Sequence, residues 1–149
     1  MQKYTPTHDY LKYWKVVRQY IKSRYKLTQA DLDILLFLRT EDYFSKDKFE
    51  EFDRLLSWDD RRFNRLLKDG WIEVFRKRKG KRKGLYTLSF HAKHVVASIY
   101  RKLNGEEIPM TAEHNPMFLK NVSYSDKRYR EAIIAMNESI RQQRHHAPE

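Results

Sequence analysis

The hydrophobic pattern of this 149-residue chain changes its period at Gly70. Up to that glycine, apolar residues recur about every 3.6 residues, as they do on one face of a helix. Residues 71–75 and 85–88 instead have the pattern of short strands, and the helical period returns after Ser89. Helices, one hairpin and further helices, in that order, predict a mainly α fold with a small β-hairpin.

The segment between the two predicted strands is strongly basic. Residues 76–84 contain seven Lys or Arg and two Gly, which predicts a flexible, positively charged hairpin tip. The whole chain has 31 basic and 20 acidic residues, a net charge of +11. Because seven unopposed like charges repel one another, their presence at one tip favours a polyanionic partner over a plain solvated turn.

Capping residues mark where the helices should begin. Ser57 should cap a helix of about residues 58–69, with Asp59 and Asp60 in its first turn and Gly70 at its end. The other expected helices span about residues 8–25 or begin at Thr28 (with Asp31 in the capping-box position), Ser45, Ser89 and Ser125.

Three helices followed by a basic hairpin is the order of elements in a winged helix-turn-helix. In such a unit the second helix of the pair, here residues 58–69, enters the major groove of duplex DNA, and the hairpin, or wing, contacts the flanking phosphates. The residues that we expect to contact DNA are Ser57, Trp58, Arg61, Arg62 and Arg65, and on the wing Lys77, Arg78, Lys79, Lys81, Arg82 and Lys83. Two alternatives stay open: the arginines could pair with acidic residues of their own helix, and Trp58 could be buried under its start.

Apolar stripes on the first and last helices predict a dimer interface. They consist of Tyr10, Trp14, Val17 and Ile21 near the N-terminus and Tyr129, Ile133, Met136 and Ile140 near the C-terminus. Such stripes could pack within one chain. A bundle of terminal helices far from the winged lobe would have little else to cover it, however, so we expect it to pair with a second copy as a homodimer.

These motifs together resemble the MarR family of transcriptional regulators over about residues 8–104. The resemblance is carried by Leu27-Thr28 before Ile34-Leu35-x-x-Leu38, by Ser57, by the run from Arg65 to Glu73, by the basic wing and by Tyr86-Thr87-Leu88-Ser89. It implies a homodimer of N- and C-terminal helices that binds pseudo-palindromic double-stranded DNA. The sequence departs from the family at Gly80, where the wing usually has an Asp two residues before the Arg that is Arg82 here. Many members bind small phenolic effectors, and no residue here indicates such a ligand.

We therefore expect one structural domain in three parts. These are an N-terminal dimerisation helix (1–26), a winged helix-turn-helix DNA-binding lobe (27–90), and a region of long helix, irregular linker and C-terminal dimerisation helix (91–149). Two other functions stay open. One is non-specific nucleic-acid binding by a replication or packaging accessory protein, including a phage-encoded one; the other is protein–protein interaction through a winged-helix fold.

Several classes of protein are disfavoured by composition. The chain has no Cys, so it has neither a thiol nucleophile nor a cysteine zinc site. His91 and His94 have metal-ligand spacing but no nearby carboxylate, and no nucleophile and base can be paired, so we expect no metal, no cofactor and no enzyme activity. No apolar run approaches a membrane span, and the expected location is the cytoplasm.

Overall fold

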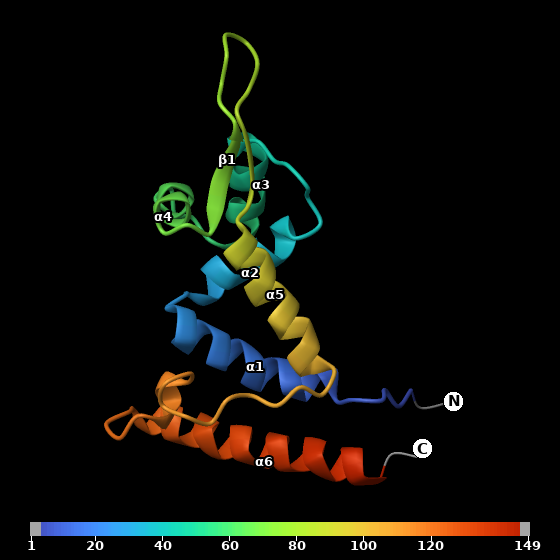
Figure 1. Cartoon of the computed structure of the whole chain (residues 1–149). Coiled ribbons are helices and arrows are strands. Elements are labelled where there is room, and N and C mark those ends of the chain that lie inside the picture. Colours follow the sequence, from blue (N-terminus) through green and yellow to red (C-terminus); the bar gives the residue numbers. More distant parts are fainter. Residues whose placement is uncertain (1–3, 147–149) are drawn as a thin grey trace. The chain divides into compact units, whose positions relative to one another are not determined.

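The computed structural model describes residues 4–146 and confirms the mainly α fold with one small hairpin (Figure 1). The elements are α1 (Tyr10–Tyr25), α2 (Gln29–Leu38), α3 (Lys46–Leu56), α4 (Arg62–Lys68), β1 (Ile72–Arg76), β2 (Leu85–Leu88), α5 (Phe90–Leu103), a 3-10 turn η1 (Pro116–Phe118) and α6 (Tyr124–His146). The chain divides into two compact units. A continuous unit spans Leu27–Ser98, and a split unit is formed by the segments on either side of it.

The continuous unit begins with a capped helix, as predicted. The Thr28 hydroxyl accepts a hydrogen bond from the Asp31 N–H, and the Asp31 carboxylate accepts one from the Thr28 N–H, which completes a capping box at α2. At α3 the Ser45 hydroxyl accepts a hydrogen bond from Lys48 N, and Ser89 accepts one from Ala92 N in the first turn of α5. The apolar faces of these helices form a core with β1 and β2 that includes Leu32, Leu35, Leu38, Phe44, Phe49, Phe63, Leu66, Ile72 and Leu88.

The hairpin is antiparallel, and an isolated β-bridge joins β2 to the segment before α3. Ile72 is opposite Leu88 and Val74 is opposite Tyr86, with a register irregularity just beyond Val74. Phe44, which lies between α2 and α3, exchanges two backbone hydrogen bonds with Tyr86, at 2.9 and 2.8 Å. Because Phe44 is buried, this bridge ties the hairpin to the helical core from which it extends.

The helix expected at residues 58–69 is shorter than predicted and begins later. α4 starts at Arg62, and Ser57 is instead the C-cap of α3, its N–H donating to Asp53 O at 2.8 Å. Asp59 and Asp60 therefore lie in the turn between the helices and not in the first turn of α4. Gly70 follows α4 with a φ of +81°, a backbone conformation that glycine adopts without strain, as predicted.

The split unit packs α1 against α6 within one chain. Val17, Ile21, Ile133, Met136 and Ile140 are all buried in the single chain. The prediction that these five side chains form a dimer interface is therefore wrong, and the alternative of packing within one chain holds for them. The remaining members of the two stripes, Tyr10, Trp14 and Tyr129, stay partly exposed.

The irregular segment before α6 is held by side chains. Asn137 on α6 accepts a hydrogen bond from Ile108 N at 2.9 Å and donates one to Ile108 O at 2.8 Å. Asn137 and Ile108 are both buried, so the pair satisfies backbone groups that cannot reach water. Ser123, and not Ser125, accepts a hydrogen bond from Asp126 N at the start of α6.

Candidate nucleic-acid interface

The outward face of α4 presents a stripe of polar side chains. Arg61, the N-cap residue of α4, is exposed, as are Asn64 and Lys68 within the helix. The three are spaced three and four residues apart, and Arg65 N donates to Arg61 O, so they share one face. Phe63 and Leu66 are buried on the opposite face. Within residues 4–146 the side chains of the three exposed residues make no hydrogen bond or ion pair, which leaves their donors and acceptors open to a partner.

Arg62 lies in the interior and not on the surface where the sequence analysis placed it. Its side chain is only 5% exposed. Its Nε donates to Asp31 at 2.9 Å, its Nη1 donates to Asp53, and its Nη2 lies 3.5 Å from Asp59. Burial disfavours the charged guanidinium, but the bonds to Asp31 and Asp53 outweigh this effect and raise the pKa of Arg62. We therefore remove Arg62 from the residues expected to contact DNA.

Arg65 is partly committed to the same ion cluster. Its Nη2 lies 2.5 Å from Asp31 and its Nη1 lies 3.3 Å from Asp59, while its side chain is 39% exposed. Asp59 also accepts a hydrogen bond from Arg61 N at 3.0 Å, and this bond, together with the two guanidinium groups, lowers the pKa of Asp59. The ion cluster thus joins the turn before α4 to α2 and α3, and it fixes how α4 is presented.

Two further predictions for this segment have different outcomes. Ser57 Oγ is buried, which removes Ser57 from the expected DNA contacts. Trp58 is 86% exposed, with the Arg54 guanidinium 6.0 Å from its ring centroid, so it does not lie buried under the helix start. A role for Trp58 at a DNA surface stays a prediction.

The hairpin ends in a tight two-residue turn. Lys79 and Arg82 exchange two backbone hydrogen bonds, at 3.0 and 2.9 Å, on either side of Gly80 and Lys81. Gly80 has a φ of +59°, whereas Lys81 does not have a positive φ. Glycine at the first position of such a turn is typical of type II′, which accounts for a glycine at the position where the resembled family has an Asp.

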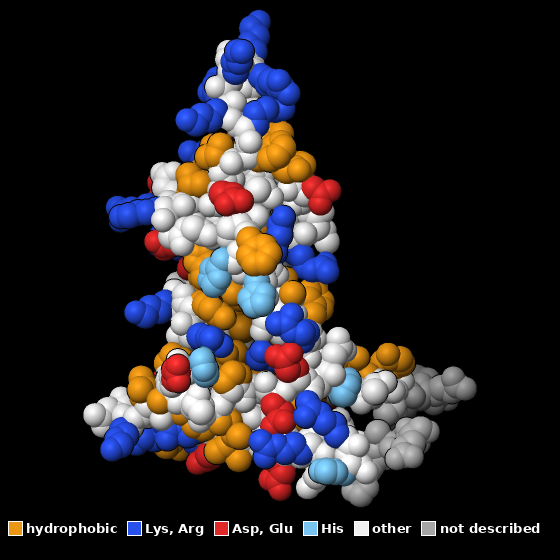
Figure 2. Space-filling model, viewed as in Figure 1, with side chains coloured by type: hydrophobic (Ala, Val, Ile, Leu, Met, Phe, Trp, Pro, Cys, Tyr) orange, Lys and Arg blue, Asp and Glu red, His pale blue; other side chains and the backbone are white. Residues whose placement is uncertain are grey.

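Every basic residue of the wing after Arg76 is exposed to solvent. These residues are Lys77, Arg78, Lys79, Lys81, Arg82 and Lys83. Figure 2 shows Lys and Arg side chains gathered over the hairpin tip. Their roles as DNA contacts stay predictions, but their exposure meets the first requirement.

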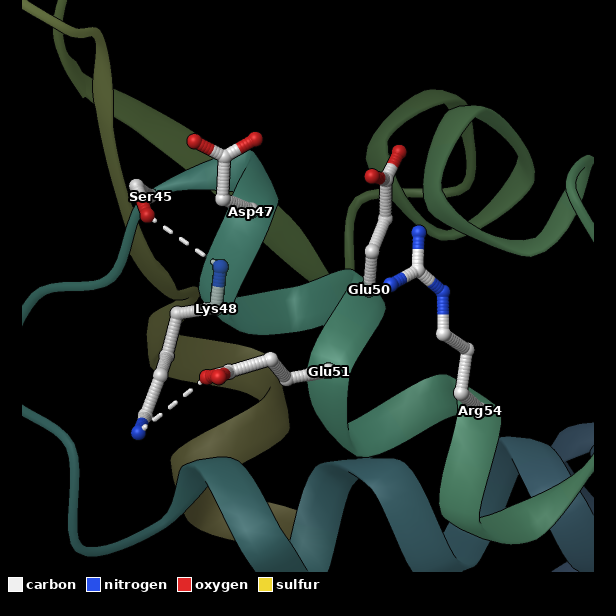
Figure 3. A pocket seen from close by; sticks show the side chains of 6 residues that line it. All are labelled: Ser45, Asp47, Lys48, Glu50, Glu51 and Arg54. Atoms are coloured by element: carbon white, nitrogen blue, oxygen red, sulfur yellow. Dashed lines mark hydrogen bonds and ion pairs between the residues drawn. The ribbon is translucent and has the colours of Figure 1, made fainter.

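One wing lysine is tied to α3. Lys83 Nζ lies 2.6 Å from Asp47 Oδ2, and this hydrogen bond lowers the pKa of Asp47. Asp47 belongs to the polar outer face of α3, shown in Figure 3, where a shallow depression is lined by Ser45, Asp47, Lys48, Glu50, Glu51 and Arg54. Lys48 Nζ is 3.4 Å from Glu51, so acidic and basic groups are interspersed on this face. The outer face of α3 is consequently poorly suited to a polyanion, in contrast to α4 and the wing.

Asn64 and Lys68 were not among the residues that the sequence led us to expect at a DNA surface. The signal was available, because both follow Arg61 at the spacing of one helix face and no apolar residue shares that face. Arg62 was expected at the DNA surface because of its charge. Its burial depends on hydrogen bonds to Asp53, on the preceding helix, and to Asp31, which the sequence indicated only as a capping-box residue.

Within residues 4–146, no group of three or more His, Asp or Glu side chains is placed to hold a metal ion. In the same part of the chain, no helix is both long and apolar enough to cross a membrane.

Helices α2, α3 and α4 followed by the β1–β2 hairpin make the continuous unit a winged helix-turn-helix, as the order of elements predicted. No family model and no curated protein matches the sequence.

Among solved structures, the chain is similar to regulators of the MarR type. Wild-type MarR from E. coli in its apo form is 20% identical, with 84% of this chain and 87% of that chain covered and a TM-score of 0.44. A MarR-family transcriptional regulator from Silicibacter pomeroyi is 16% identical, with 92% and 86% covered and a TM-score of 0.45. Overoxidized AbfR bound to DNA is 18% identical, with 63% and 66% covered and a TM-score of 0.44.

Proposed function

We propose that this protein binds duplex DNA sequence-specifically as a non-enzymatic, cytoplasmic, dimeric transcriptional regulator of MarR type. One observation carries the proposal. The same winged unit has both an exposed basic wing and a stripe of polar side chains on α4 (Arg61, Asn64 and Lys68) that bond to no other described residue. A helix of this kind fits the major groove, where side chains reach base edges, and lysines and arginines on a wing neutralise phosphates.

Exposed apolar side chains of the split unit support the dimer. Between 46% and 83% of the surface of four apolar residues stays exposed although α1 packs against α6: Leu11, Leu119, Tyr124 and Ile134. A second copy of the chain would remove such side chains from water, which is favourable at about 25 cal/mol per Å² of apolar surface. Two copies would also present two α4 helices, as a pseudo-palindromic site requires.

Non-specific nucleic-acid binding would need the wing but not the stripe. Phosphates attract cations irrespective of sequence, whereas the neutral amide of Asn64 gains no charge attraction from a phosphate and can both donate to and accept from one base edge. The composition of the α4 stripe therefore favours sequence-specific binding over the accessory role.

Selection from a random duplex library, at roughly 0.15 M salt, tests the proposal, because non-specific binding is weakened there. We expect enrichment of an inverted repeat with half-sites about one helical turn apart. Retention of DNA without any motif would contradict sequence-specific regulation, and absence of binding even at low salt would contradict DNA binding altogether.

Arg61→Ala should relax the base preference at one position of the selected half-site. If Arg61 bonds guanine bidentately, its loss costs about 1–3 kcal/mol of discrimination. Titration of the selected duplex and of single-base variants measures the effect, with Lys127→Ala on α6 as a charge-matched control. Unchanged affinity and preference in Arg61→Ala would contradict the placement of α4 in the groove.

Asp47→Asn should tighten binding to all duplex sequences. The change releases Lys83 from its ion pair and removes one negative charge beside the wing. One additional phosphate contact steepens the salt dependence by about 0.9 in log K against log salt, which amounts to about fivefold in affinity near 0.15 M. Glu138→Gln on α6 makes the same charge change elsewhere and should have little effect, whereas equal affinities for wild type and Asp47→Asn would show that Lys83 does not contact phosphate.

A further inference from the structure

Asn64 differs from its neighbours on α4 in having a free amide. The Arg62 side chain forms ion pairs with buried carboxylates, and the Arg65 side chain forms ion pairs with Asp31 and Asp59. Asn64 is exposed, and within the described residues 4–146 its side chain has no hydrogen-bond partner. Its carbonyl oxygen and its NH₂ group are thus both available to a ligand that offers one donor and one acceptor side by side.

The position of Asn64 within the stripe points to a base and not to a phosphate. Arg61 and Lys68 lie about 4.5 Å and about 6 Å from it along the helix axis, at 1.5 Å per residue. The stripe is therefore about 10 Å long, close to three base-pair steps. Its two ends carry positive charge and its centre carries a neutral amide, which is the arrangement expected of one base-reading group flanked by two phosphate- or guanine-seeking cations.

The platform beneath Asn64 is rigid enough for a bidentate contact. Phe63 and Leu66 anchor the helix in the core, and Arg62 joins it to α2 and α3 through Asp31 and Asp53. A pair of parallel hydrogen bonds needs a side chain whose backbone does not shift, and α4 supplies that condition.

We infer that Asn64 determines sequence specificity by recognising an adenine in the major groove, with Nδ2 donating to N7 and Oδ1 accepting from the N6 amino group. The inference rests on the proposed function, since it names the base that the α4 surface selects. Each half-site then contains one A·T pair whose replacement weakens binding more than that of its neighbours.

The test uses the duplex selected by the wild-type protein, with each adenine of a half-site replaced in turn by 7-deazaadenine. 7-Deazaadenine pairs normally but lacks the N7 acceptor. Because the change is made in the DNA, the effect is measured on the unaltered wild-type protein, and misfolding of a variant cannot cause it. We expect one position at which the replacement weakens wild-type binding by about fivefold to a hundredfold, and at which Asn64→Ala shows no further loss. Lys68→Ala, the matched variant on the same face, should weaken all duplexes but keep the full effect of the replacement.

The outcomes separate the inference from the proposed function. Two results overturn the inference and leave sequence-specific binding intact. In one, no adenine replacement in the selected motif weakens wild-type binding; in the other, the replacement weakens binding by Asn64→Ala as much as binding by the wild type. Binding without a motif also overturns the inference while leaving DNA binding. A wild-type protein that retains no DNA overturns the proposed function and the inference with it.

Discussion

Replacing Arg62 with alanine is expected to lower the free energy of unfolding by about 3–5 kcal/mol, the cost of breaking a buried ion pair from one side. The Arg62 side chain is 5% exposed, and those of its partners Asp31 and Asp53 are 4% and 10% exposed. Without the guanidinium, these carboxylates would be buried next to one another with Arg65 as the nearest remaining cation. Chemical denaturation followed by circular dichroism at neutral pH measures the loss.

Arg61→Ala is the matched control for this prediction. It removes the same kind of side chain from the adjacent, exposed position and should change stability by no more than about 0.5 kcal/mol. Arg62→Lys keeps the charge but not the planar fork that reaches more than one carboxylate, so it should fall between the two. Equal stability of Arg62→Ala and Arg61→Ala would contradict the role assigned to the ion cluster.

Replacing Lys77, Lys79 and Lys81 together with glutamine is expected to weaken DNA binding by about a hundredfold near 0.15 M salt. Each lost phosphate contact reduces the slope of log K against log salt by about 0.9, so three contacts reduce it by about 2.7. Because all three lysines are exposed and lie outside the Lys83–Asp47 pair, the folded state should be unaffected. Equilibrium titrations at several salt concentrations give both the affinity and the slope.

Three exposed lysines elsewhere provide the control for net charge. Lys93, Lys120 and Lys127, changed together to glutamine, lower the total charge by the same amount and should leave the slope nearly unchanged. If both triple variants bind alike, the wing has no special role and only the overall charge of the protein matters.

Local signals predicted most of the winged unit. The capping box at Thr28 and Asp31, the caps at Ser45 and Ser89, and the left-handed Gly70 all depend on residues within a few positions of one another. The bounds of β2 were correct and β1 was shifted by one residue. Such elements are determined by neighbours in the sequence, and sequence analysis finds them for that reason.

Two errors concern the segment around α4, one through contacts between residues distant in the sequence and one through a local choice of helix end. Arginine is a residue type usually found at the protein surface, and the Arg62 side chain is buried because it bonds to Asp31 and Asp53. Asp31 was assigned one role, in a capping box, and has a second one in the ion cluster. The start of α4 was misplaced because Ser57 ends α3 instead of capping α4, a choice that its residue type does not decide.

The apolar stripes show a different limit. Periodicity identified Val17, Ile21, Ile133, Met136 and Ile140 as residues of buried faces, and all are buried. Periodicity does not tell a helix of the same chain from a helix of another copy, because both would cover the stripe equally well. The stripes were therefore correct as buried surface and wrong as dimer contacts.

The division of the chain has a consequence for its synthesis. The residues of the continuous unit leave the ribosome one after another, whereas α1 ends at Tyr25 and its partner α6 ends at His146. At about 5–20 residues per second, the apolar face of α1 is without its partner for about 5–25 s. Residues 1–26 carry seven basic residues and one acidic residue. Because other nascent copies carry the same charge in this segment, electrostatic repulsion opposes their association during the interval.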